Sequence, residues 1–203
     1  MNDLRKEFST FNIALMAVAI AINIAVGTLV LGLKVPLYLD SIGTVLVGVL
    51  VGPWAGAATG FLANIIWAFL GNPAYAPFAG VAAIIGALAA AFARAGWVKE
   101  WWKAAVAGLV TGLVAAFISA PIAAYVFGGT LGAGTDAIVA MFRAAGLDAL
   151  GANIAQGITS DPIDKMISFL VVWAVLQALP ARFQARFSGE GAPAKKAPAR
   201  KRR

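Results

Sequence analysis

The chain of 203 residues contains no cysteine and no histidine. This absence excludes disulfides, thiol nucleophiles, imidazole acid–base catalysis and the common Cys/His zinc sites. The sequence also lacks a GxxxxGK phosphate loop, which excludes ATP hydrolysis at a site of that kind. No catalytic constellation is visible among the remaining residue types. We therefore expect a protein that is not an enzyme and that needs no cofactor or metal.

Charged residues are scarce as well. They make up 12% of the chain, whereas 61% is hydrophobic and the mean hydropathy is +0.85. A soluble protein carries about 25% charged residues. The 53 residues 41–93 contain no Lys, Arg, Asp or Glu, an omission that is expected inside a bilayer because buried charge is costly there. The composition predicts an integral membrane protein with room for about five to seven spans.

The net charge of +7 has a local origin, because six of the sixteen basic residues lie in the last nine positions. We expect residues 1–187 to form one membrane-embedded domain and residues 188–203 to form a disordered basic tail. Such a tail is expected to lie on anionic lipid at the cytoplasmic face rather than on nucleic acid. The N-terminal segment is too acidic and too short for a signal peptide, so the first apolar helix is expected to be retained.

Apolar runs and breaker residues predict an all-α bundle of six transmembrane helices, at about 8–33, 42–51, 54–70, 78–93, 104–127 and 162–179. The second helix is short and ends at Gly52-Pro53, which is either a turn or a kink. A turn gives six spans and places most basic residues, with both termini, on one side. The positive-inside rule therefore favours six helices with both termini cytoplasmic.

The region before the last predicted helix is less regular. Apolar residues at helical spacing within 147–159 predict a short amphipathic segment at the membrane surface. After it, Asp161 is expected to cap the last helix, with Pro162 at its first position.

Small residues recur at helical spacing in two places. Gly48, Gly52, Gly56 and Gly60 predict a groove in which another helix approaches closely. On the first predicted helix the small residues of one face include Ala17, Ala21 and Ala25. That face has two interpretations, namely packing within the chain or docking of another membrane subunit.

Polar and aromatic residues gather at the extracellular end of the six-helix arrangement, as a small-molecule pocket requires. Simpler interpretations remain for several of them: helix capping for Asp40 and its neighbour Ser41, an internal pair or snorkelling for Asp164 and Lys165, and helix–helix contact for Asn64. Trp67 and Tyr75 also suit an interfacial aromatic belt. The predicted binding residues are Tyr38, Asp40, Asn64, Trp67, Asn72, Tyr75, Tyr125, Asn153, Gln156, Asp164 and Lys165.

Over about residues 8–187 the chain resembles the substrate-binding S components of energy-coupling factor (ECF) transporters. The resemblance rests on the six-helix layout, the Ala17-x-x-x-Ala21 pair, the short second helix, the run LVGVLVGPWAGAATGFLANII and the DPIDK segment. It implies a protein of the prokaryotic plasma membrane that binds a vitamin-like micronutrient at its outer side and carries it across. A transmembrane coupling protein and two cytoplasmic ATPases would be its partners.

In that family the alanine pair faces the coupling protein, so the resemblance gives this role to Ala17 and Ala21, with Ala25 as a possible extension. No motif matches a vitamin-specific subfamily, so the substrate is not implied. Two other classes of function stay open from the residues alone. One is a self-sufficient small transporter or channel, which needs ionisable groups near the bilayer centre. The other is a non-transporting membrane sensor or assembly subunit.

Overall fold

The computed structural model describes residues 2–180 and residue 187, and in this part of the chain the regular elements are all helical. The basic tail, 188–203, and residues 181–186 of the predicted domain lie outside the described residues. The elements, in order, are α1 (Asn2–Glu7), α2 (Thr10–Gly32), α3 (Ile42–Leu50), α4 (Pro53–Phe69), η1 (Pro73–Phe78), α5 (Ala79–Arg94), η2 (Trp97–Lys99), α6 (Trp101–Phe127), α7 (Asp136–Ala144) and α8 (Ala149–Ala178).

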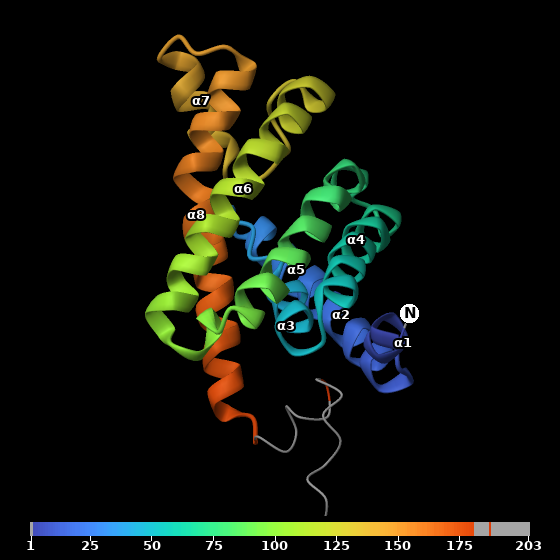
Figure 1. Cartoon of the computed structure of the whole chain (residues 1–203). Coiled ribbons are helices and arrows are strands. Elements are labelled where there is room, and N and C mark those ends of the chain that lie inside the picture. Colours follow the sequence, from blue (N-terminus) through green and yellow to red (C-terminus); the bar gives the residue numbers. More distant parts are fainter. Residues whose placement is uncertain (1, 181–186, 188–203) are drawn as a thin grey trace, which may run out of the picture.

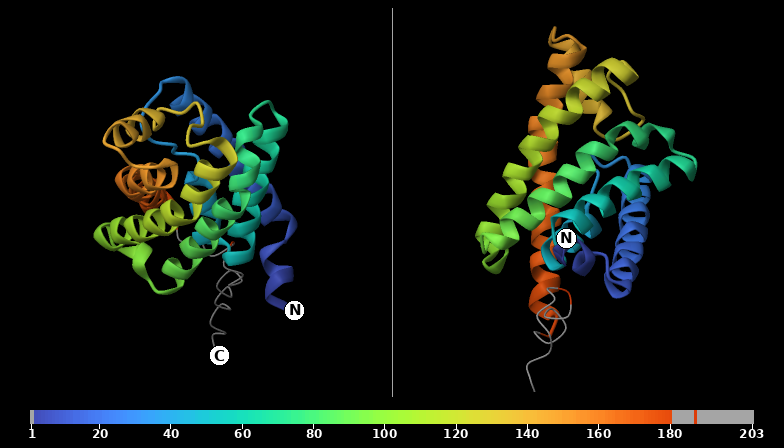
Figure 2. Two further views of the ribbon diagram at one scale, coloured as in Figure 1. Left: turned by 90° about the horizontal axis from the view of Figure 1, so that it is seen from above. Right: turned by 45° about the vertical axis from the view of Figure 1, so that its right-hand side comes forward.

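The helices form a bundle in which α6 and α8 run side by side, while α3, α4 and α5 pack together and α2 lies against α3 and α4 (Figures 1 and 2). The short helix α7 lies at one end of the bundle, against α8. Helix α1 and the last turn of α8 lie toward the other end (Figure 1).

Among the described residues, three segments are long and apolar enough to cross a membrane: Thr10–Gly32, Pro73–Arg94 and Trp101–Phe127. The expected all-helical membrane architecture agrees with this finding, whereas six crossings are not confirmed. Helix α3 has 9 residues and α4 has 17, against about 20 for a full span. Helix α8 is long enough, but it carries charged residues in its middle.

The Gly52-Pro53 junction is a turn and not a kink, because α3 ends before it and α4 begins at Pro53. Gly52 has φ 149°, a conformation that a side chain disfavours. The Glu7 carboxylate accepts a hydrogen bond of 2.9 Å from the Ala55 N–H in the first turn of α4. An acid from α1 thus caps the helix that follows the turn.

The glycines of this region allow close helix packing, as their spacing predicted for three of the four. A Cβ on Gly48 or Gly56 would overlap the backbone of Gly86 on α5, and one on Gly60 would overlap the neighbouring α5 backbone. Gly52 instead belongs to the turn. On the other side of the bundle, Gly112 of α6 meets the α8 backbone at 161–162 in the same way. The bundle is therefore held by direct backbone approach.

The predicted break before the last helix is wrong. Helix α8 runs without interruption through Pro162, and its N-cap is Asp148, whose side chain accepts from the Gly151 N–H at 2.7 Å. Asp161 therefore lies inside a helix, and residues 147–159 mostly form its first half. The dense contact with α6 overrides the local helix-start signal. Helices α1 and α7 were not anticipated.

The alanines of the predicted docking face do not pack against the described part of the chain. Ala17, Ala21 and Ala25 are all exposed, whereas the opposite face of α2, including Ala19 and Asn23, is buried. Of the two interpretations of this stripe, internal packing is therefore wrong for the described residues.

Candidate functional site

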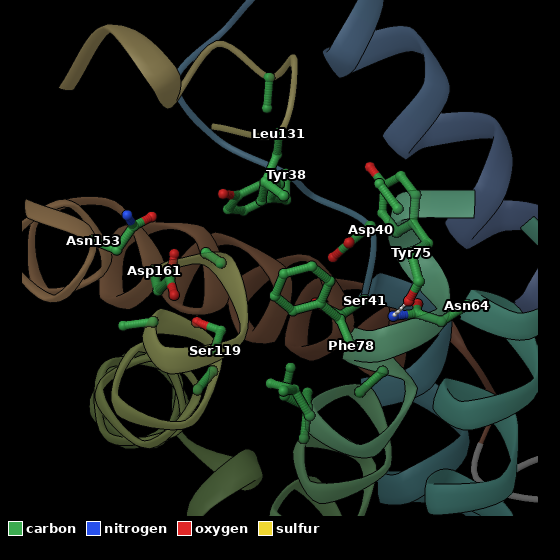
Figure 3. Close-up of a pocket in the computed structure, with 18 of the residues that line it drawn as sticks. Tyr38, Asp40, Ser41, Asn64, Tyr75, Phe78, Ser119, Leu131, Asn153 and Asp161 are labelled. Atoms are coloured by element: carbon green, nitrogen blue, oxygen red, sulfur yellow. Dashed lines mark hydrogen bonds between the residues drawn. The ribbon is translucent and has the colours of Figure 1, made fainter. Parts of the chain in front are cut away.

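A cavity opens between the loop after α2, the segments η1, α5 and α6, the loop before α7, and α8 (Figure 3). The cavity has a volume of about 100 Å³, on the measure by which a single bound water needs about 10–15 Å³. The cavity is therefore large enough for a small organic molecule. Its polar lining consists of Tyr38, Asp40, Ser41, Asn64, Asn72, Tyr75, Ser119, Asn153, Gln156, Asp161 and Lys165.

Helix α8 fixes the loop after α2 through Asp164, which is fully buried. Its Oδ1 accepts hydrogen bonds from the backbone N–H groups of Tyr38, at 2.9 Å, and Leu39, at 2.7 Å. The neighbouring Lys165 ammonium donates to Asp164 Oδ2 and lies 3.4 Å from Asp40 Oδ1. Burial raises the pKa of Asp40 above its ordinary value, and the charge of Lys165 opposes this shift.

A second loop, 128–135, closes over the first. The Tyr38 hydroxyl and the Thr135 hydroxyl are 3.0 Å apart, and Lys34 Nζ donates to the Gly132 carbonyl at 2.6 Å. Asp136, at the start of α7, accepts from the Gly132 N–H at 2.7 Å. Burial raises the pKa of the Tyr38 phenol, so the hydroxyl keeps its proton at neutral pH and can donate a hydrogen bond.

An aromatic pair supports one wall of the cavity. The rings of Trp67 and Tyr75 stack with centroids 3.7 Å apart and planes inclined by 17°. Trp67 also packs against Gly27 of α2, where a Cβ would overlap its ring. Asn64 Nδ2 donates to the Tyr75 carbonyl at 3.3 Å, a bond drawn in Figure 3. Asn64 thus contacts the η1 segment and lines the cavity at the same time, which its two sequence interpretations had offered as alternatives.

Polar residues of α8 line the opposite wall. Asn153 Nδ2 donates to the Ala149 carbonyl at 2.8 Å, and Gln156 Nε2 donates to Ser160 Oγ at 2.6 Å. Ser160 in turn donates to Asp161 Oδ1 at 3.2 Å. These bonds hold side chains that also border the cavity, as a preorganised binding surface requires.

The structure brings eight of the eleven predicted binding residues to this cavity: Tyr38, Asp40, Asn64, Asn72, Tyr75, Asn153, Gln156 and Lys165. Trp67 and Asp164 lie directly behind lining residues and support them. Tyr125 does not belong to the lining, since it is 75% exposed on the outer face of α6. Ligand binding by these residues remains a prediction.

Sequence reasoning missed three polar lining residues. Ser41 and Asp161 were interpreted as helix caps. The side chain of Ser41 makes no capping bond although it precedes α3, and Asp161 lies inside α8. Ser119 donates to the Ala116 carbonyl of its own helix at 3.3 Å and carried no sequence signal. Within the described residues there is no group of three or more Asp or Glu side chains that could hold a metal ion.

No protein-family model matches the chain, and neither does any curated protein or solved structure with which it was compared.

Proposed function

We propose that this chain is the substrate-binding S component of an ECF-type transporter, which binds a small water-soluble micronutrient and carries it across the membrane. The observation that carries the proposal is the cavity. Polar residues from segments up to 126 positions apart, such as Tyr38 and Asp164, come together around one cavity of an otherwise apolar bundle. Ligand pockets have this character, with a few oriented polar groups in an apolar and aromatic wall.

The exposed alanine stripe of α2 supports the same proposal. Ala17, Ala21 and Ala25 form a smooth face with no partner in the described part of the chain. A transmembrane helix of a coupling protein can approach such a face closely. With two ATPases bound to that protein, the complex would supply the energy that a chain without a phosphate loop has to obtain elsewhere.

In this proposal α2, α3, α4, α5, α6 and α8 are the six membrane helices, and both termini are cytoplasmic. The Gly52 turn between α3 and α4 supports the count, because it keeps the basic clusters on one side. The natural absence of cysteine makes the topology simple to test. A cysteine at Pro73 should react with an impermeant thiol reagent from outside, and one at Ala95 only after permeabilisation. The reverse pattern would overturn the topology.

The experiment for the function is native mass spectrometry of the chain, purified gently from its own host. A bound molecule of vitamin size, or ATPases that co-purify with the chain, is the expected result. A protein that carries neither would contradict the proposal and favour a sensor or assembly subunit. A chain that takes up its ligand alone in liposomes would contradict it in favour of a self-sufficient transporter.

A further inference from the structure

The cavity is bordered by an excess of negative charge. Asp40 and Asp161 line it, Asp164 lies directly behind it, and Lys165 is the one basic residue among the lining residues. The three carboxylates outnumber the one ammonium that pairs with them among the described residues. A buried carboxylate without a counter-ion either binds a proton or needs a positive partner, and a bound cation supplies such a partner.

The imbalance is greatest at Asp161. Its side chain is almost fully buried, and its hydrogen bond comes from the neutral Ser160 hydroxyl. No Lys or Arg in the described part of the chain lies within ion-pairing distance of it. Lys165 serves the other two carboxylates and has no remaining charge to offer an anion. The arrangement therefore favours a positively charged ligand over an anionic one.

A separate observation is a buried hydroxyl group in the cavity lining that has no hydrogen-bond partner. Ser41 is only 3% exposed, and its Oγ has no hydrogen-bond partner. It lies next to Asp40 in the lining, as Figure 3 shows. A buried hydroxyl is seldom left unpaired, so the missing partner is expected to come from a bound molecule.

The aromatic side chains of the cavity lining indicate the shape of the rest of the ligand. In Figure 3 the two carboxylates Asp40 and Asp161 stand on either side of the space that Tyr38 and Phe78 border. Tyr75 adds a third ring, held by its stack on Trp67. Aromatic faces attract cations and planar rings, and desolvation strengthens the attraction.

We infer that the cavity binds an organic cation with a flat aromatic body, with its positive charge between Asp40 and Asp161. This inference rests on the proposed function, because it specifies the substrate class of the same site. A metal ion is not favoured, since the described residues offer no cluster of three ligands for one. The carboxamide side chains Asn64, Asn72, Asn153 and Gln156 can bind polar groups at the edge of the ring.

The test uses three probes of nearly the same ring size and different charge: 1-methylnicotinamide, a permanent cation, nicotinamide, which is neutral, and nicotinate, an anion. Binding to the purified full chain in uncharged phosphatidylcholine nanodiscs is measured by thermal shift and calorimetry. We expect the cation to bind about tenfold tighter than nicotinamide, and nicotinate to bind weakest. Asp161→Asn should reduce the preference for the cation, whereas the matched change Asp148→Asn, at an exposed position outside the cavity, should not.

Equal binding of the three probes, preference for nicotinate, or no binding of any of them would overturn the inference. If Asp161→Asn fails to fold, the probe series on the unmodified chain still decides the matter. A neutral or anionic molecule found bound by native mass spectrometry would also overturn it, while leaving the proposed transport function intact. Failure of the function itself would appear as the absence of any bound molecule and of ATPase partners.

Discussion

Asp164 and Leu39 are joined by a hydrogen bond of 2.7 Å from the Leu39 N–H to the carboxylate, across 125 positions of sequence. Leu39 has φ 49°, in the left-handed region that a branched side chain rarely adopts. Such a conformation costs about 1–2 kcal/mol and persists only where surrounding contacts hold it. The carboxylate of α8 therefore keeps the cavity loop in a shape that the loop would not adopt alone.

Removing that carboxylate should destabilise the protein, and part of the loss should come from the unpaired charge left on Lys165. Asp164→Ala leaves Lys165 buried beside Asp40 alone, and we expect it to lower the free energy of unfolding by about 3 kcal/mol or more. In the double change with Lys165→Met the loss should be smaller than the sum of the two single losses. Thermal unfolding in one detergent, arranged as a double-mutant cycle, measures both effects. Additive losses, or a single variant as stable as the unmodified chain, would show that the pair does not hold the loop.

The turn at Gly52 gives a second stability prediction. Gly52→Ala adds a Cβ to a residue at φ 149°, in a position that the Glu7 carboxylate already occupies. We expect a loss of about 1–3 kcal/mol. Gly80→Ala is the matched control, since Gly80 lies near the start of α5 with nothing within 4 Å of the added atom. The melting temperature of the control should stay the same or rise; an equal fall in both variants would refute the role of the turn.

Local signals in the sequence were sufficient for much of this fold. The apolar runs and the breaker pair at Gly52 predicted five of the six helices to within a few residues, because membrane composition and glycine–proline chemistry are local, whereas the last helix begins at Ala149 and not at Pro162. Eight of the eleven predicted binding residues line the cavity, since polar residues are scarce in the apolar helices. What failed depends on tertiary contact: Pro162 lies within a helix that its contact with α6 maintains, and Tyr125 faces outward on α6.

The roles of individual polar residues could also not be predicted from the local sequence. Asp161 and Ser41 stand where caps are common, and only the packed structure shows that neither side chain caps a helix. The buried link between Asn23 and the start of α3 was missed because a lone amide in an apolar helix does not reveal its partner. Its Oδ1 accepts from the Gly43 N–H at 2.7 Å and its Nδ2 donates to Thr44 Oγ1 at 2.8 Å.

The alanine face of α2 should be needed for assembly and not for ligand binding. Ala17→Trp or Ala21→Trp places a large ring where a coupling protein is proposed to approach closely, so we expect its co-purification with the ATPases to fall at least about tenfold. Binding of the molecule found by native mass spectrometry should be unchanged. Ala174→Trp, at an exposed position of α8, controls for a bulky ring on the bundle surface. Complexes that persist with Trp at both positions 17 and 21 would refute the docking face.

The aromatic wall should contribute directly to affinity. Tyr75→Ala removes a lining ring that stacks on Trp67, and we expect binding of the co-purified molecule to weaken about tenfold or more. Tyr125→Ala makes the same chemical change at an exposed position outside the cavity, and affinity should not change. Calorimetry on the two variants compares them directly. A similar loss in both, or none in Tyr75→Ala, would place the ligand elsewhere.

Affinity for a cation should depend on pH through Asp40. Only the ionised carboxylate attracts the charge of 1-methylnicotinamide, and this probe carries its charge at every pH. Because burial raises the pKa of Asp40, binding should begin to weaken as the pH falls at a value above the ordinary range of an aspartate, about 4. The groups that face Asp40 are Lys165, Asp164 and Asp161 of α8, together with Tyr38 and Tyr75.

Calorimetric titrations between about pH 5 and pH 8 measure this dependence. The affinity for the cation should fall toward the acid end, while that for neutral nicotinamide stays level. Asp40→Asn removes one titrating carboxylate, so the slope should become shallower and the affinity at pH 8 should drop. An affinity for the cation that is level, or that rises as the pH falls, would mean that Asp40 does not face the positive charge of the ligand, and the position assigned to that charge would be wrong.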